Sequence, residues 1–153
     1  MKVQQVNPFV TAACDVLSGE TGQQVTRGAI ALEADPYTTE EVTALVGISG
    51  SIRGSLYLSM SLDTAVALVS TMLGQAVESF DALAQSGIAE LANVVAGAAG
   101  TAMSNDGVAI DITPPLMMVG AGARISAVDL QRVAVPIDTA CGQISVHLAF
   151  RND

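Results

Sequence analysis

A glutamate and an asparagine lie three positions apart in a segment that otherwise holds mostly alanine, glycine and aliphatic residues, Ser86-Gly-Ile-Ala-Glu90-Leu-Ala-Asn93. On an α-helix, residues i and i+3 are neighbours, so the carboxylate of Glu90 and the carboxamide of Asn93 can enter one cleft together. A carboxamide is neutral and offers both an acceptor and donors, which suits it to holding a water molecule. This pair is the candidate chemical site of the chain.

The helical period also predicts what surrounds the pair on a helix spanning about residues 81–103. At about 100° per residue, Ser86, Glu90, Asn93 and Gly97 form one stripe. One flank of the stripe is predicted to carry very small residues, which would let another backbone approach closely: Ala82, Ala89, Ala92, Ala96 and Gly100. The predicted core face consists of Ala84, Ile88, Leu91, Val95, Ala98 and Ala102. This geometry suits the presentation of Glu90 and Asn93 to a macromolecular partner.

Hydration alone is the competing explanation for Glu90, because an amphipathic helix needs a solvated face and glutamate is a good helix former. Asn93 is different. Asparagine inside a helix costs several tenths of a kcal/mol relative to alanine. In a segment so rich in alanine, the asparagine favours a functional role at this position.

The elements that must position the helix follow from hydrophobic periodicity and turn residues. A first helix is predicted over residues 8–17, with Asn7 as N-cap and Pro8 in the first turn. A second helix begins after Ser61 or Asp63 and ends at Gly74. Strands are predicted at residues 25–32, 42–48, 52–60, 108–112, 116–119, 132–137 and 144–150. The order predicts one α+β domain over residues 1–153, with an antiparallel β-sheet covered by long α-helices on one face.

Composition limits the classes of function. Half of the 153 residues are hydrophobic, which is enough for a large core. No stretch reaches the roughly 18 apolar residues of a membrane span, and the N-terminal stretch lacks the apolar run of a signal peptide, so we expect a cytoplasmic protein. The net charge is −9 and the six basic residues are scattered. The chain therefore has no basic stripe for nucleic acid or for an anionic membrane surface.

The usual catalytic groups are absent from the sequence. Cys14 and Cys141 have no metal-ligand spacing and are expected to be small buried residues. The single histidine, His147, points to the opposite side of its predicted strand from the aliphatic residues 144, 146, 148 and 150. One histidine without a cysteine or histidine partner makes a zinc site improbable, and no nucleophile is marked beside it.

The motif Ser-x-x-x-Glu-x-x-Asn resembles the signature of the CheC/CheX/FliY phosphatases of bacterial chemotaxis. The resemblance extends over nearly the whole chain, through Asn7-Pro8-Phe9, Gly47-Ile-Ser-Gly50-x-x-x-Gly54, Met72-Leu73-Gly74, Glu90-Leu-Ala-Asn93-Val-Val-Ala-Gly97 and Val135-Pro136-Ile137. The proline that family members carry after the asparagine corresponds to Pro114 or Pro115. CheC proteins typically carry two such helices, and residues 63–74 lack a Glu-x-x-Asn, so CheX is the closer match. Ala98 departs from the polar residue of many CheX-like sequences, and we expect it on the core side.

The resemblance implies a phosphatase that acts on the aspartyl phosphate of a CheY-like response regulator. Acyl phosphates are reactive, so such a protein mainly has to hold a water in line with the phosphorus. Asn93 would orient that water, and Glu90 would pair with the active-site lysine of the receiver domain. Ser86 and Gly97 would contact the partner at the rim. No cofactor is expected on this chain, because the phosphorylated partner supplies Mg²⁺.

Two other functions remain open at this point. The first is a non-catalytic module that docks a receiver domain or a flagellar-switch component through the same helix. The second is a structural protein whose apolar excess serves self-association. A homodimer is expected together with the phosphatase function as well, because the resemblance implies dimers formed by pairing sheets and exposed strand edges favour such pairing.

Overall fold

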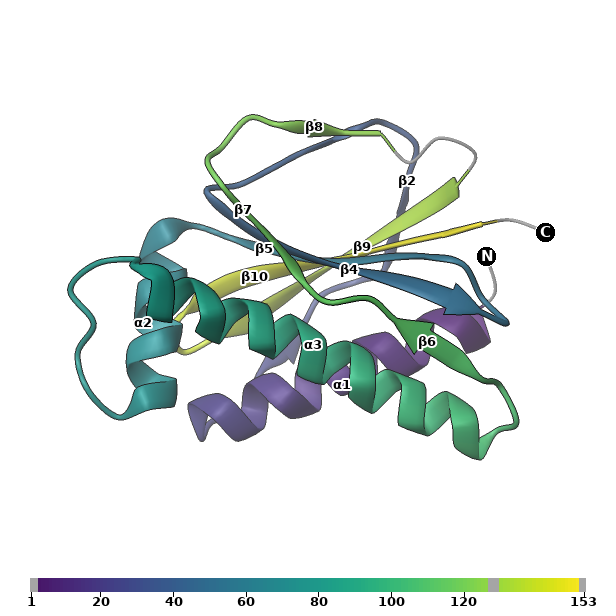
Figure 1. Ribbon diagram of the computed structural model, residues 1–153, viewed down its shortest axis with the longest axis horizontal. Coiled ribbons are helices and arrows are strands. Elements are labelled where there is room, and N and C mark those ends of the chain that lie inside the picture. Colours follow the sequence, from purple (N-terminus) through teal and green to yellow (C-terminus); the bar gives the residue numbers. More distant parts are fainter. Residues whose placement is uncertain (1–2, 127–129, 152–153) are drawn as a thin grey trace.

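The computed structural model describes residues 3–126 and 130–151. Three helices, α1 (Val3–Thr21), α2 (Leu62–Leu73) and α3 (Ala82–Asn105), lie on one face of an eight-stranded antiparallel sheet (Figure 1). The predicted α+β architecture is confirmed.

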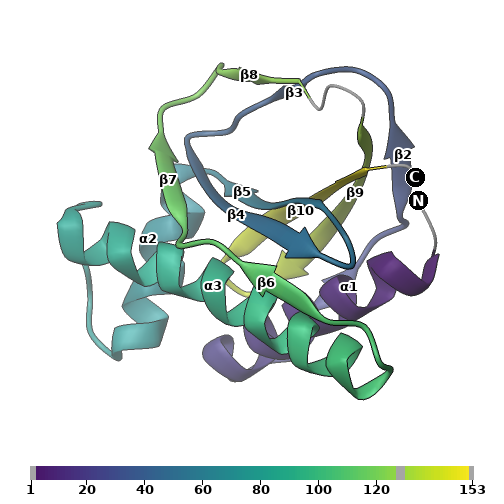
Figure 2. The ribbon, with the colours of Figure 1, turned by 45° about the vertical axis from the view of Figure 1, so that its right-hand side comes forward.

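The sheet has its long strands in the middle and its short ones at the edges. Its order is β1-β9-β10-β5-β4-β6, with β2 also paired to β9 and β7 also paired to β4. A separate two-stranded sheet, β3 with β8, lies beyond the face that the helices leave open (Figure 2). The strands are β1 (Thr26–Arg27), β2 (Ala31–Glu33), β3 (Tyr37–Thr38), β4 (Val42–Gly50), β5 (Gly54–Met60), β6 (Ile110–Ile112), β7 (Leu116–Val119), β8 (Arg124–Ile125), β9 (Leu130–Thr139) and β10 (Gly142–Arg151).

The core lies between the sheet and the helices. The alternation in β10 that the sequence shows is confirmed, because Ile144, Val146, Leu148 and Phe150 are fully buried. The ring of Phe150 packs on that of Phe9 from α1, with 5.5 Å between the ring centroids. Each such aromatic side chain buries a large apolar area, and burial of this kind drives the helices onto the sheet.

The helix ends agree with the local sequence signals. Ser61 caps α2, since its hydroxyl accepts a hydrogen bond from the Thr64 backbone N–H. Gly74 ends this helix in the left-handed region at φ 69°. Asp81 caps α3 by accepting from the Ala84 N–H at 2.9 Å. These caps satisfy backbone donors that a helix start leaves unpaired, so they fix where α3 begins.

The prediction for the start of the first helix is wrong. Helix α1 begins at Val3, so Asn7 is not an N-cap and Pro8 lies inside the helix. A proline at this position removes the hydrogen bond to the carbonyl of Gln4, which costs about 3 kcal/mol in an ordinary helix interior. The added turn buries Val6 beside Phe9, and that packing favours the longer helix.

Two smaller expectations also differ. The predicted strand at 25–32 is divided into β1 and β2 at Gly28, whose N–H donates to the Pro136 carbonyl at 2.8 Å. A Cβ at Gly28 would lie 2.7 Å from Pro136 Cγ, so this close approach requires glycine. Cys14 and Cys141 are half-buried at the edge of the core rather than fully buried.

Candidate active site

Helix α3 carries the candidate site on the side that faces away from the sheet. Its buried face consists of Ala84, Ile88, Leu91, Ala92, Val95, Ala96, Ala99 and Met103. On the opposite side Ser86 and Glu90 are exposed, while Asn93 and Gly97 are half-buried. The structure therefore places all four residues of the predicted stripe where a second molecule can reach them.

The two central side chains are not used to stabilise the fold. Among the described residues, neither Glu90 nor Asn93 has a side-chain hydrogen bond or an ion pair. A polar side chain inside a helix gains little from its own fold when it bonds to nothing. Both groups are available to bind an external molecule.

The predicted orientation of α3 needs one correction. Ala98 and Ala102 are exposed and border a groove against α1, whereas the sequence placed them on the core face. Ala92 and Ala96 are buried, although they were expected to border the site. Alanine occurs on both sides of this helix, so the spacing of the apolar residues does not determine which face of α3 turns toward the core. Ala92 and Ala96 therefore pack inside the protein's own fold and are not available to a partner.

The same correction reveals two residues that the sequence analysis missed. Leu83 and Val94 are 65% and 43% exposed, and they lie seven residues before and four residues after Glu90. These spacings place them on the same side of the helix as Glu90. The separation of Leu83 and Val94 from Glu90 in the sequence could have identified them. Their apolar side chains extend the exposed surface around the candidate site.

Gly97 has no packing reason to be glycine. An added Cβ at this position would have no atom within 4 Å, and the backbone is helical. The glycine borders a hollow of about 330 Å³ between α3 and β6, whose other walls include Thr101 and Ile112. The open space beside Gly97 is therefore maintained at a cost in helix stability, because glycine is about 1 kcal/mol less favourable than alanine in a helix interior.

Substitution of Gly97 by alanine is expected to stabilise the fold by about 1 kcal/mol and to weaken binding of the partner, because the new methyl group enters the open space. Urea unfolding and a partner-binding titration measure the two effects. Gly19→Ala in α1 is the matched control, since a Cβ there also meets nothing within 4 Å. The control should gain similar stability without a change in binding. Equal binding by the two variants would contradict a role for Gly97 at the interface.

Pro114 and Pro115 connect β6 to β7, and α3 contacts both of these strands (Figure 1). The two prolines thus follow the strand that borders the hollow beside Gly97. That one of these two prolines corresponds to the proline of the family motif stays a prediction.

Within residues 3–126 and 130–151, no group of three or more histidine, cysteine, aspartate or glutamate side chains could hold a metal ion. In the same part of the chain, no helix has the length and apolar character needed to cross a membrane.

Comparisons with known proteins agree with this arrangement. A CheC-like superfamily protein from Shewanella sp. PV-4 superposes with a TM-score of 0.89 and 26% identity, over 99% of this chain and 100% of that one. A chain of the CheX–CheY–BeF₃–Mg²⁺ complex from Borrelia burgdorferi superposes with a TM-score of 0.85 and 26% identity, over 99% of this chain and 100% of that one. The fold is thus that of the CheC-like proteins.

Sequence comparison identifies the family within this class. The model of the family described as chemotaxis phosphatase CheX matches residues 42–138, which include all of α3. The CheY-P phosphatase CheX of Thermotoga maritima is 30% identical over 128 residues, 83% of each chain. The chain belongs to the CheX family of chemotaxis phosphatases.

Proposed function

We propose that this protein accelerates hydrolysis of the aspartyl phosphate on a CheY-like response regulator. The observation that carries the proposal is the accessible, unpartnered pair of Glu90 and Asn93 on the outer side of α3. Family membership supports it, since the Thermotoga relative is a CheY-P phosphatase. The Borrelia complex supports the partner, because it joins a CheX to CheY with beryllium fluoride and Mg²⁺.

Asn93 is assigned to the water. An acyl phosphate already has a good leaving group, so the main requirement is a water oxygen in line with the bond from phosphorus to the aspartate oxygen. The carboxamide oxygen accepts a hydrogen bond from this water, and the neutral side chain is not repelled by the phosphoryl oxygens. As the water oxygen bonds to phosphorus, the bond to the aspartate oxygen breaks and the carboxylate leaves. The proton passes to the released phosphate or to solvent.

Glu90 is assigned to a cation of the partner. A carboxylate would be repelled by the phosphoryl oxygens, so its charge must be directed to another group. The active-site lysine of the receiver domain has the matching charge. Such a pair orients the partner and places Asn93, its neighbour on the helix, at the phosphorus.

The other two residues of the site contact the partner, and the partner supplies the metal ion. Ser86 lies one turn before Glu90 at the rim, and Gly97 lies one turn beyond Asn93, where it leaves room for the partner. The phosphorylated regulator brings Mg²⁺, which neutralises charge on the phosphoryl group. In this scheme the chain contributes no cofactor and acts in the cytoplasm.

The direct test mixes the protein with a phosphorylated receiver domain and Mg²⁺ and follows loss of the phosphoryl group. Acceleration over the receiver's own decay is expected. If the decay rate is unchanged at saturating protein, the proposal is wrong and a binding role through the same helix takes its place.

Replacement of Glu90 by glutamine removes the charge and keeps the shape. The expected result is at least a tenfold loss in kcat/KM, through KM, because the receiver's lysine is left unpaired at the interface. Glu78→Gln is the matched control, since Glu78 is also exposed and lies outside α3. Equal losses in the two variants would show that only overall charge matters.

We also propose that the protein acts as a homodimer joined at a sheet edge. Strand β7 lies on the outer side of β4, and its Leu116 and Val119 are 66% and 56% exposed. Exposed apolar residues on an edge strand favour pairing with a second copy. Light scattering should give twice the mass of one chain, and a monomer at micromolar concentration would exclude this part of the proposal.

A further inference from the structure

The hollow of about 330 Å³ between α3 and β6 has no part in the chemistry assigned to Glu90 and Asn93. Strand β6 runs beside the C-terminal half of α3 (Figure 1). The walls of the hollow include four residues of the helix and two of the strand, namely Gly97, Gly100, Thr101, Ser104, Ile110 and Ile112. All six are exposed or half-buried, so the hollow is open to solvent and to a second molecule.

The hollow continues the candidate site along the same side of α3. Three of its residues follow Asn93 at steps of three or four positions: Gly97, Thr101 and Ser104. At 1.5 Å per residue, Gly97 lies roughly 6 Å from Asn93 along the helix axis. A standard protein interface covers roughly 800 Å² on each partner, which equals a disc of roughly 16 Å in radius. A receiver domain that docks on Glu90 and Asn93 therefore also covers the near part of the hollow.

The two glycines of the hollow differ in what surrounds them. A Cβ at Gly100 would lie 3.4 Å from Ile110 Cγ1, so the isoleucine side chain already occupies most of the space there. A Cβ at Gly97 would meet no atom within 4 Å. This chain leaves the space at Gly97 empty, although alanine would favour the helix. We therefore expect a group from another molecule to fill it.

The wall that β6 contributes is held in place by the sheet. Ile110 and Ile112 belong to the stretch of β6 that pairs with β4. Directly after the strand, the Thr113 N–H donates to the Gly47 carbonyl at 2.9 Å, and the Thr113 hydroxyl accepts from the Gly47 N–H at 2.8 Å. The hollow is thus formed before a partner arrives, so binding there requires little further ordering of this chain.

The residues around the hollow favour an uncharged, apolar group. Among the described residues, those that line the hollow carry no charge. Ile110 and Ile112 are only partly buried against the core, so a partner can cover the apolar surface that remains. The Thr101 hydroxyl already donates to the Gly97 carbonyl at 3.1 Å. A charged side chain placed here would lose its water without gaining an opposite charge.

We infer that the hollow between α3 and β6 receives one uncharged, apolar side chain of the receiver domain, of the size of leucine, methionine or phenylalanine. The inference rests on the proposed function, which supplies the partner. A volume of about 330 Å³ is at the lower end of the range of small-molecule sites, so the hollow admits a side chain and not a helix. Apolar anchors that fill pockets contribute much of the binding energy of an interface, so this contact selects which receiver binds.

Two variants change the hollow from its two sides and leave Glu90 and Asn93 intact. Gly97→Leu fills it from the helix, and Ile112→Thr removes apolar surface from the strand while it keeps a β-branched side chain. The probe is a receiver domain with beryllium fluoride and Mg²⁺, the combination in the Borrelia complex. In a fluorescence titration, Gly97→Leu should raise the Kd for this receiver by about tenfold, because the anchor is excluded. Ile112→Thr should raise it by about threefold, because less apolar area is covered.

Matched controls make the same exchanges outside the hollow. Ala102→Leu adds a leucine to an exposed position of α3, and Ile30→Thr changes an isoleucine that is 37% exposed. Both controls should bind the receiver as the wild-type protein does. The titration requires no turnover. Binding without accelerated dephosphorylation would therefore contradict the proposed function, while the Kd values of the variants would still decide the role of the hollow.

Methyl NMR identifies the group that enters. In protein with ¹³C-labelled isoleucine methyl groups, the signals of Ile110 and Ile112 should show contacts to methyl or aromatic protons of the bound receiver, and the signal of Ile30 should show none. Unchanged Kd values for both folded hollow variants would overturn the inference, as would contacts to a charged side chain alone or no binding of the receiver to the wild-type protein. If Gly97→Leu instead converts a dimer into a monomer, the occupant is a second copy of the chain and the inference is wrong.

Discussion

Replacing Asn93 with alanine is expected to lower the rate of receiver dephosphorylation at saturating protein by about 10²-fold, while the affinity for the receiver stays within about threefold. The reason is geometric, because a water that is no longer held in line loses most of the advantage of position. Single-turnover decay of the phosphorylated receiver measures the rate, and a fluorescence titration measures the affinity.

The fold should not suffer in this variant. Asn93 makes no side-chain hydrogen bond, and alanine is the better helix former by several tenths of a kcal/mol. Stability should therefore rise slightly while activity falls. Asn7→Ala is the matched control, because Asn7 is an exposed asparagine inside α1. If Asn93→Ala retains full turnover, the water-orienting role is refuted.

This variant also separates the two functions that share the helix. A phosphatase loses turnover and keeps binding when Asn93 is removed. A non-catalytic docking module would show binding in both forms and acceleration in neither. Leu83 and Val94 would serve either function as apolar contacts, so the asparagine is the informative position.

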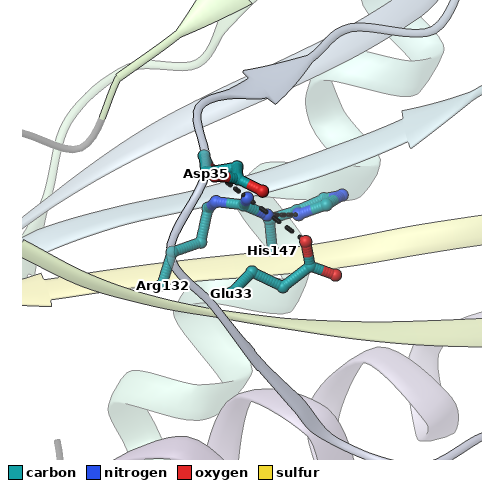
Figure 3. Close-up of polar contacts among 4 residues, drawn as sticks. All are labelled: Glu33, Asp35, Arg132 and His147. Atoms are coloured by element: carbon teal, nitrogen blue, oxygen red, sulfur yellow. Dashed lines mark hydrogen bonds and ion pairs between the residues drawn. The ribbon is translucent and has the colours of Figure 1, made fainter.

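A second large effect is expected on acidification, from His147. Arg132 Nη1 lies 3.0 Å from the Nδ1 atom of this histidine (Figure 3). Burial, and secondarily the charge of Arg132, lower the pKa of His147 from 6.5 in the unfolded chain to about 4 in the folded protein. Between these values the unfolded chain binds a proton that the folded protein excludes, so stability is full above pH 6.5 and falls as the pH is lowered toward 4. At 1.36 kcal/mol per unit, the loss from this group is about 2 kcal/mol at pH 5 and about 3 kcal/mol below pH 4.

Urea unfolding at pH 7, 6 and 5 measures this loss. His147→Asn is the control, since its amide oxygen takes the position of Nδ1, where it can still accept from Arg132, and it has no proton to gain in this range. The variant should show a flatter dependence of unfolding free energy on pH between 6.5 and 5. Parallel curves for the two proteins would show that other groups cause the acid sensitivity.

The sequence by itself determined the elements whose signals are local. Ser61 and Gly74 mark the two ends of α2 through bonds to residues within one turn of them. Strict alternation in residues 144–150 identified both faces of β10. The accessible positions of Glu90 and Asn93 also followed from the helical period, because these polar residues differ so strongly from their neighbours.

Only the tertiary structure decided the features that depend on distant partners. The start of α1 depends on Val6 packing into the core, and the face of α3 that turns inward depends on the packing that buries Ala92 and Ala96. Alanine on both sides of a helix gives no local preference, so packing selects the buried face. A cluster of polar side chains joins residues 33 and 37 to 132 and 147. No periodicity links segments so far apart, because burial and hydrogen bonding act across space after the chain has folded.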